Sequence, residues 1–242
     1  MNEITYPPIA ELYAAWKHRN ELSGVAREDA YKFIKEMIIN LELKPGMPVS
    51  DKVLAAELEM SRTPVREALI LLMSSNMIVV KPQSGTFIAP INIERLLLEQ
   101  FKRYAMEKEA VSLAMTRFSR GLAEKYDEVN RKYAALVTAG GTVDHVGLLK
   151  LDNDFHRIAF EAAGLEKHYA NLFSEMEHFE RFRELSLLSG SPGYVLHDHM
   201  AIADAIVKGD KELVGSLLET HLFRFREQLE NLKEKYPDYF AL

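Results

Sequence analysis

The sequence predicts a mainly α-helical protein, in which an N-terminal winged helix-turn-helix is followed by an all-α antiparallel bundle of about six helices. Two short amphipathic segments joined by a tight turn predict the helix-turn-helix. A pair of β-prone runs around a turn predicts the wing that follows it. From residue 91 onward, apolar residues recur at helical spacing and the breaks fall at glycines and polar turns, which predicts the bundle.

The chain is expected to divide into an N-terminal extension, a winged helix-turn-helix and a helical domain, at residues 1–24, 25–90 and 91–242. Four apolar residues of the extension recur at helical spacing: Ile9, Leu12, Tyr13 and Trp16. Two interpretations of the extension stay open. It is an extra helix that packs on the core or on a partner subunit, or it is a partly ordered arm.

Capping and breaking residues predict the helix-turn-helix. An apolar helical repeat ends at residues 44–46, and Ser50 is then placed to cap a second short helix. After a tight turn, Ser61 is placed to cap a third helix, with Pro64 in its first turn, where a missing N–H costs nothing. Two β-prone runs then bracket a turn at residues 82–85, which completes the winged helix.

The third helix carries candidate DNA-contacting side chains. Its apolar residues share one face, which leaves Arg62, Thr63 and Arg66 pointing away from the core. A helix N-terminus that presents arginine and hydroxyl groups suits phosphate and base-edge contacts in the major groove of DNA. The alternative is an unrelated helical hairpin with surface arginines. The order of the helix-turn-helix and the wing favours DNA binding.

Composition limits the class of protein. The 242-residue chain has no cysteine, so it forms no disulfides. Neither a targeting segment nor an apolar run long enough to cross a bilayer is visible, which predicts a cytoplasmic protein without membrane contact. The net charge is −6, but residues 25–90 carry eight Lys/Arg and eight Asp/Glu. DNA binding would therefore depend on locally placed cations, and a dimer would be needed to double the contacts.

Six helical runs are expected in the helical domain, at residues 94–118, 122–138, 143–163, 166–188, 193–208 and 210–235. Asp152 and His156, four residues apart, lie on the apolar face of the third run. His199 and His221 lie on the apolar faces of the fifth and sixth runs. Because a buried carboxylate is normally paired or bound to metal, one Zn²⁺, Ni²⁺, Mn²⁺ or Fe²⁺ ion would satisfy all four groups. The alternative is that they are hydrogen-bonded core residues.

Several motifs occur in order over about residues 25–90: Lys44-Pro45-Gly46, Leu54-Ala55, Ser61 to Leu69, and Ser84-Gly85-Thr86. Together they resemble the DNA-binding domain of GntR-type bacterial transcription regulators. The resemblance implies that six residues contact operator DNA: Lys52, Ser61, Arg62, Thr63, Arg66 and Gly85. The family commonly has arginine at position 52, so the lysine here is expected to touch phosphate rather than a base edge. Residues 74–77 also depart from the family's usual acidic-glycine turn.

The helical domain contains Asp152-Asn153-Asp154-Phe155-His156, then His199, then His221-Leu222. Over about residues 94–235 it resembles the FCD effector domain of the FadR-like branch of these regulators. The resemblance implies that Asp152 and the three histidines hold a divalent metal at the floor of a cavity, beside which a small organic acid binds. Arg103 and Glu107 resemble the pair that opens this domain, so Arg103 is expected to clamp an effector carboxylate, with Arg183 as a weaker candidate. The alternative for Arg103 is a solvent-exposed ion pair.

Three functions fit these residues. The first is a transcription regulator, a repressor by analogy with the family, in which a homodimer reads a near-palindromic operator and a small carboxylate alters operator affinity. The second is a metal-dependent enzyme that activates water at the Asp/His site. The third is a regulator whose metal is structural or is itself the signal. Because no separate general base or nucleophile is found beside the metal set, the sequence favours a regulator over an enzyme.

Overall fold

The computed structural model describes residues 6–117, 119–138, 144–190 and 193–241. The chain forms two units, one of which runs up to Ile93 and takes in the chain again from Tyr236, while the other is Glu94–Lys235. Two expected helix boundaries lie outside the described residues: residue 118, where the first run was expected to end, and residue 143, where the third was expected to begin. So do residues 1–5 of the N-terminal extension and residue 242.

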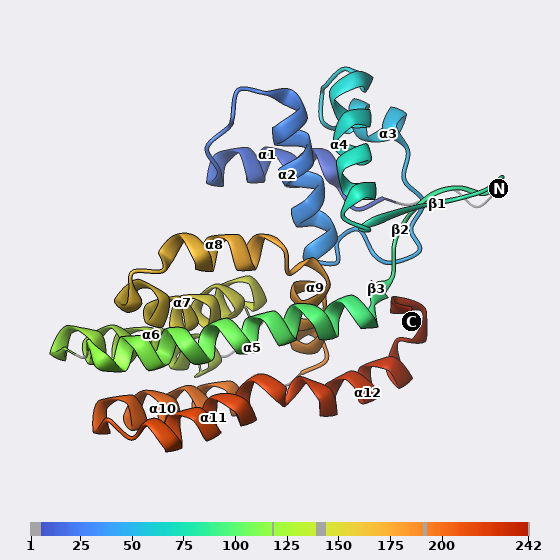
Figure 1. Ribbon diagram of the computed structural model, residues 1–242. Helices are drawn as coiled ribbons and strands as arrows, with labels where there is room; N and C mark the ends of the chain where they lie inside the picture. The colour runs from blue at the N-terminus through green and yellow to red at the C-terminus, as the bar shows by residue number, and fades with distance from the viewer. Residues whose placement is uncertain (1–5, 118, 139–143, 191–192, 242) are drawn as a thin grey trace. The chain divides into compact units, whose positions relative to one another are not determined.

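The first unit contains the predicted winged helix-turn-helix (Figure 1). Its elements are α1 (Ile9–Arg19), α2 (Ala26–Ile39), α3 (Asp51–Glu57), α4 (Arg62–Ser74), β1 (Ile78–Lys81) and β2 (Gly85–Ile88). The two strands pair antiparallel, with Ile78 opposite Ile88 and Lys81 opposite Gly85. Gly85 has a φ of +115°, which residues with a Cβ rarely adopt, so glycine is needed where the wing turn ends.

The core of the first unit forms where α2 packs on α4. Ile34 and Ile38 of α2 are buried there, as are Val65 and Leu72 of α4. All four recur at helical spacing, which puts them on the inner faces of the two helices. The predicted winged-helix fold is therefore confirmed, because its helices bury the residues that defined them in the sequence.

Helix α1 settles the two interpretations of the N-terminal extension in favour of an extra helix packed on the core. Ile9, Tyr13 and Trp16 are buried in the same apolar cluster as α2. The Trp16 indole N–H donates to a Glu36 carboxylate oxygen at 2.7 Å, and the Tyr13 ring lies 5.0 Å from that of Phe33. Burial of two aromatic rings, with the indole N–H hydrogen-bonded, stabilises the packing of this short helix on α2.

The chain beyond residue 90 contains two short strands that the sequence did not reveal. β3 (Ile91–Asn92) pairs in parallel with β4 (Phe240–Ala241), which follows a short 3₁₀ turn, η1 (Pro237–Tyr239). The segment from Tyr236 therefore belongs with the first unit, although the expected helical domain extended to the end of the chain. Strands of two residues are too short to show an alternating pattern, so the sequence beyond residue 90 predicted helices alone.

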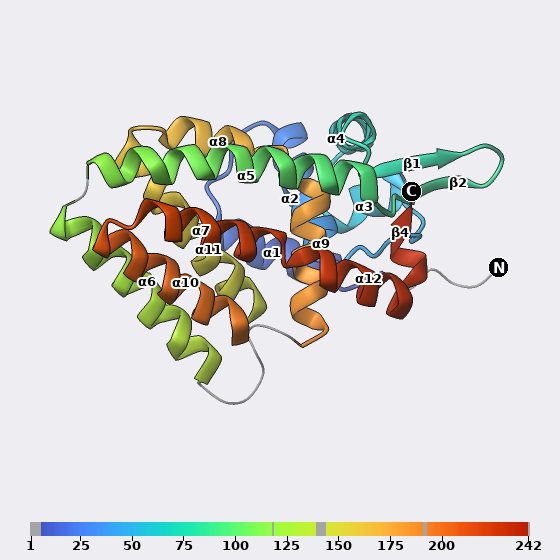
Figure 2. The same cartoon turned by 60° about the horizontal axis from the view of Figure 1, so that its bottom comes forward.

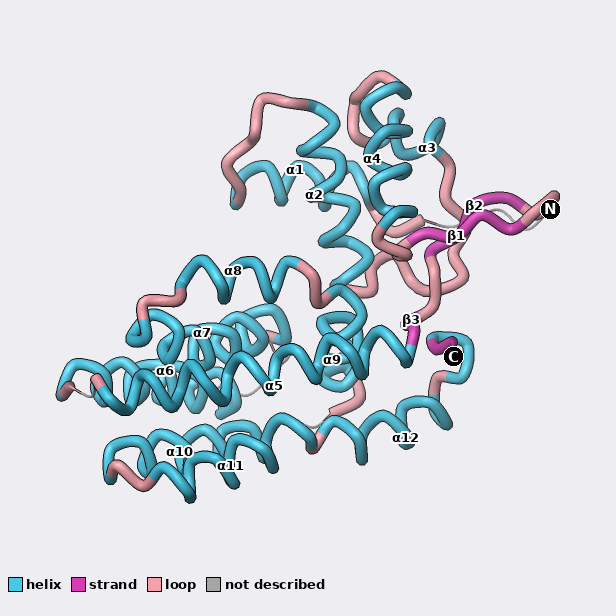
Figure 3. Tube along the Cα trace, in the orientation of Figure 1, coloured by secondary structure: helices cyan, strands magenta, loops and turns pink. Residues whose placement is uncertain are grey.

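In the part of the second unit that the structure describes, all the regular elements are helices, as the tube in Figure 3 shows. Its described helices are α5 (Ile93–Thr116), α6 (Arg120–Thr138), α7 (His145–Ala163), α8 (Glu166–Ser174), α9 (Glu177–Leu188), α10 (Gly193–Lys208), α11 (Lys211–Phe223) and α12 (Phe225–Lys235). Helix α6 packs beside α7 and α10, and α10 packs beside α11 (Figure 2). No helix in the described ranges is long and apolar enough to cross a membrane.

The described part of this unit has eight helices where about six were expected. The run at 166–188 divides into α8 and α9 at residues 175–176, and the run at 210–235 divides into α11 and α12 at Arg224. Arg224 keeps helical backbone angles, with φ −58° and ψ −24°, so apolar spacing continues through the break. Sequence periodicity alone does not reveal a division of this kind.

Candidate metal centre and DNA-reading surface

The residues expected to contact DNA lie on the exposed surface of the first unit. All six are exposed: Lys52, Ser61, Arg62, Thr63, Arg66 and Gly85. Of the two predicted helix caps, Ser50 accepts a hydrogen bond from the Val53 N–H at 3.4 Å. The Ser61 side chain stands at the start of α4 but makes no capping hydrogen bond. Its hydroxyl is therefore not committed to the helix start.

Asp51 is a neighbour of this surface that sequence reasoning missed. The Nη2 of Arg62 donates to both Asp51 carboxylate oxygens, at 3.0 and 2.9 Å. The Arg62 side chain is 63% exposed, so the pair contributes little to stability. It holds the guanidinium at the junction of α3 and α4 and orients it. The contact spans a turn and eleven residues, so no helical spacing could have revealed it.

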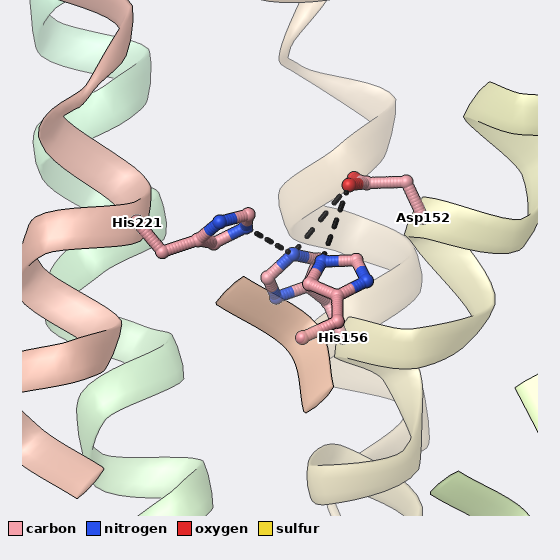
Figure 4. Close-up of side chains that lie close together, drawn as sticks. Asp152, His156 and His221 are labelled. Carbon is pink, nitrogen blue, oxygen red and sulfur yellow. Dashed lines mark hydrogen bonds and ion pairs between the residues drawn. The ribbon is translucent and has the colours of Figure 1, made fainter. Parts of the chain in front are cut away.

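The structure brings together the four residues that the sequence placed on the inner faces of three helices. Asp152 and His156 project from α7 toward His221 of α11, as Figure 4 shows. His199 approaches from α10. One ligand atom from each of these residues lies within 4.8 Å of the others. Three helices thus contribute one carboxylate and three imidazoles to a single point.

Two of the separations between these atoms match those of ligands that share one cation. The Nε2 atoms of His156 and His221 lie 3.2 Å apart, and His199 Nε2 lies 3.4 Å from Asp152 Oδ1. Ligands bound at about 2.0–2.2 Å to one ion stand roughly 3.0–3.5 Å from one another. Among the described residues, neither ring nitrogen of His199 has a hydrogen-bond partner, although the residue is fully buried. A cation would satisfy its Nε2.

Electrostatics keeps these groups in the protonation states that metals require. Burial alone would raise the pKa of Asp152, but Arg183 and the neighbouring cations hold that pKa well below its usual range. Burial lowers the pKa of His156, against the opposing effect of Glu107, and holds the pKa of His199 well below its usual value. Asp152 therefore presents an ionised carboxylate, and His156 and His199 present neutral imidazoles, near neutral pH.

Two of the histidines are oriented by carboxylates on their far sides. His156 Nδ1 lies 2.7 Å from Glu107 Oε2, and His221 Nδ1 lies 3.3 Å from Asp198 Oδ2. Arg224 donates to both oxygens of Asp198 at 3.1 Å. A carboxylate on Nδ1 fixes the tautomer and leaves Nε2 free to bind a metal. Sequence reasoning found Glu107 only as an ion-pair partner and missed Asp198 and Arg224.

The two candidate effector-binding arginines differ in how they are occupied. Arg183 donates to Asp152, and also to Asn153 at 2.7 Å, so it acts as a partner of the cluster. Arg103 donates from Nε to Glu107 at 2.6 Å, and this pair is buried rather than solvent-exposed. Its Nη2 has no hydrogen-bond partner among the described residues.

A cavity opens onto this cluster. Its lining includes Asp152, His221, Arg103 and Tyr133. Other walls are formed by residues of α9, α10 and α12, among them Phe179, Tyr194 and Gln228. A ligand in the cavity would therefore meet the Asp/His cluster and the unsatisfied Arg103 donor together.

Comparison with known proteins decides the family. Residues 26–88 match the model of bacterial regulatory proteins of the gntR family, and residues 101–224 match that of the FCD domain. The chain belongs to the GntR family. A helix-turn-helix regulator associated with an unstable DNA locus in Streptomyces ambofaciens is 30% identical over 217 residues, which are 89% of each chain. The GntR assignment implies DNA binding by the first unit and transcription regulation as its use.

Other relatives and solved structures are consistent with this assignment. The transcriptional repressor RspR of Escherichia coli is 23% identical over 215 residues, covering 88% of this chain and 93% of its own. Among solved structures, E. coli McbR/YncC superposes with a TM-score of 0.66 at 20% identity, over 89% of this chain and all of that one. A regulator from Rhodococcus sp. RHA1 gives a TM-score of 0.62 at 21% identity, over 85% of this chain and 97% of its own. These structures support the fold.

We predict that Arg183→Gln destabilises the metal-free protein by about 3–5 kcal/mol, because it removes the donor that stabilises the buried Asp152 carboxylate. Urea unfolding in a chelator at pH 7 measures the change. Arg157→Gln is the matched control, since Arg157 is half exposed and pairs with surface carboxylates on the same helix as Asp152; it should alter stability by less than about 0.5 kcal/mol. Equal effects of the two changes would contradict the assignment.

Proposed function

We propose that this GntR-family chain is a cytoplasmic repressor that acts as a homodimer on a near-palindromic operator and responds to a small carboxylate held beside a divalent metal. One observation carries the proposal: Asp152 and His221 of a cluster with metal-ligand spacing line the same cavity as Arg103, whose buried Nη2 makes no hydrogen bond within the described residues. Both groups suit a carboxylate. The first unit supplies the DNA-reading surface through which such binding would be expressed.

The metal would be held by Asp152 through Oδ1 and by the Nε2 atoms of His156, His199 and His221. Three imidazoles and one carboxylate suit Zn²⁺, Ni²⁺, Mn²⁺ or Fe²⁺. When bound, the ion would supply a Lewis-acid position for an oxygen of the effector. Glu107 and Asp198 would keep two imidazoles in orientation, which supports retention of the ion.

Charge balance favours an anionic effector. The three arginines that line the cavity, Arg103, Arg183 and Arg224, pair with four carboxylates, which leaves one excess negative charge: Glu107, Asp152, Glu180 and Asp198. A divalent ion reverses this balance and leaves one positive charge, which one carboxylate would neutralise. Arg103 is the arginine that would contact it, because its Nη2 makes no hydrogen bond within the described residues, whereas Arg183 donates to Asp152. A planar guanidinium suits a carboxylate in both geometry and charge.

The residues of the DNA-reading surface would make different contacts with DNA, according to their side-chain chemistry. Arg62 and Arg66, at the start of α4, would contact base edges or phosphates in the major groove. Lys52 would contact phosphate, and the hydroxyls of Ser61 and Thr63 would add backbone contacts. Gly85 lets the wing turn approach DNA without a side chain. Asp51 would release Arg62 when a phosphate or base takes its place.

A regulator is favoured over a metal-dependent enzyme by what surrounds the cluster. Hydrolysis needs a free base beside the metal, within hydrogen-bond reach of a bound water. Glu107 and Asp198 are the carboxylates next to the histidines, and each is already bound to an imidazole and an arginine. Both are therefore committed to positioning, which suits a binding site.

We predict that purified wild type retains about one transition-metal ion per chain and that His199→Ala loses it, because three ligands bind more weakly than four. Elemental analysis after dialysis without chelator measures the content. His197→Ala is the matched control, since His197 lies two residues away on α10 with its side chain 86% exposed; it should keep the ion. Wild type that stays metal-free after incubation with Zn²⁺ or Ni²⁺ would refute the metal part of the proposal.

Two substitutions separate DNA reading from sensing. On a duplex selected by the wild type from a random library, Arg62→Ala should weaken binding by about 1–3 kcal/mol per recognition helix, roughly 5- to 150-fold. Arg103→Lys keeps a positive charge beside the buried Glu107 but loses the planar fork, so it should leave that affinity unchanged but weaken the shift caused by small carboxylates, tested as a panel from acetate to citrate with Zn²⁺-loaded protein. Fluorescence anisotropy measures both. Release of DNA by Zn²⁺ alone, with no carboxylate effect, would instead favour a metal sensor.

A further inference from the structure

Helix α5 carries large apolar side chains on a face that nothing in its own unit covers. Leu97, Leu98 and Phe101 are 42%, 53% and 63% exposed. The opposite face of the same helix is buried, with Leu96 at 0% and Arg103 at 3%. Three adjacent exposed apolar residues on one helix face are uncommon on a monomer and indicate a contact surface.

These residues belong to a longer stripe. We define the α5 stripe as the exposed residues that recur three or four apart along this face: Glu94, Leu97, Leu98, Phe101, Ala105 and Lys108. Alternation of three and four keeps a stripe straight along one side of a helix, which is the spacing that suits packing against a second helix. Its centre is apolar and its ends are charged, negative at one end and positive at the other.

The α5 stripe is complementary to itself when two copies run antiparallel. Glu94 and Lys108 each lie seven residues from Phe101, about 10.5 Å along the helix axis. A two-fold axis at Phe101 therefore places Glu94 of each copy opposite Lys108 of the other. It also sets Leu97 against the small Ala105. A parallel arrangement would instead place like charges opposite each other.

We propose that the α5 stripe is the contact between two copies of this chain, with α5 packed antiparallel on α5 and the two-fold axis passing by Phe101. The inference rests on the homodimer of the proposed function and names its surface. In such an isologous contact each apolar residue of the stripe is buried in both copies. The two Glu94–Lys108 pairs fix direction and register, since any slip along the helix separates them.

Lys108 is available for this contact. Its ammonium group lies 3.5 Å from the Tyr104 hydroxyl and 5.5 Å from that ring's centroid, both weak contacts that a carboxylate would displace. Beside the stripe, Lys102 pairs with Glu175 at 3.3 Å on the exposed surface. Polar groups of this kind form the rim that surrounds an apolar contact.

Cross-linking tests the register, because the natural chain has no cysteine. In full-length protein, Phe101→Cys should form a disulfide-linked dimer on mild oxidation, since a residue on the two-fold axis meets its own copy. Glu94→Cys alone and Lys108→Cys alone should stay uncross-linked, because their copies stand about 21 Å apart along the helix. An equimolar mixture of these two variants should give the mixed disulfide.

Light scattering gives the second readout. Wild type should be a dimer, and Phe101→Glu should raise the dimer dissociation constant more than tenfold with an unchanged circular dichroism spectrum. A wild-type dimer in which neither Phe101→Cys nor the mixture cross-links would overturn the α5 contact and leave the homodimer standing. A monomeric wild type at micromolar concentration would overturn the homodimer of the proposed function as well.

Discussion

The buried carboxylate of Asp152 is the constraint on which the second unit depends. Burial of an unpaired charge costs several kcal/mol, so cations must stand beside it. Arg183 donates to it, and that arginine in turn binds Asn153 and Glu180. On its other side, His156 contacts Glu107 and His221 contacts Asp198. One buried charge thus accounts for a polar network that reaches across α5, α7, α9, α10 and α11.

Helix α5 carries three features: part of this network, the proposed dimer contact and the connection to the first unit. Its inner face carries Arg103 and Glu107, at the cavity, while its outer face carries Phe101 in the α5 stripe. Its first residue follows directly on β3, which belongs to the DNA-reading unit. A ligand that shifts Arg103 therefore acts on the helix that also holds the proposed dimer contact. Coupling between effector and operator needs a shared element of this kind.

Much of this was predictable from residue patterns, and the missing parts share a cause. The inward faces of three helices predicted the positions of Asp152, His156, His199 and His221, because helical spacing fixes direction. Asp198 lies beside His199 in sequence, but its contacts to His221 and Arg224 depend on how α10 packs on α11. The Arg62–Asp51 pair and the β3–β4 pairing are likewise tertiary contacts. A single sequence carries no periodic signal for them.

The central claim is that the cluster forms one metal centre with imidazole and carboxylate ligands. X-ray absorption at the metal edge of Zn²⁺-loaded protein tests it most directly. The account predicts about three nitrogen ligands with imidazole outer-shell scattering and one or two oxygens, all near 2.0–2.2 Å. A shell of oxygen ligands alone, without imidazole scattering, would place the ion elsewhere and contradict the account.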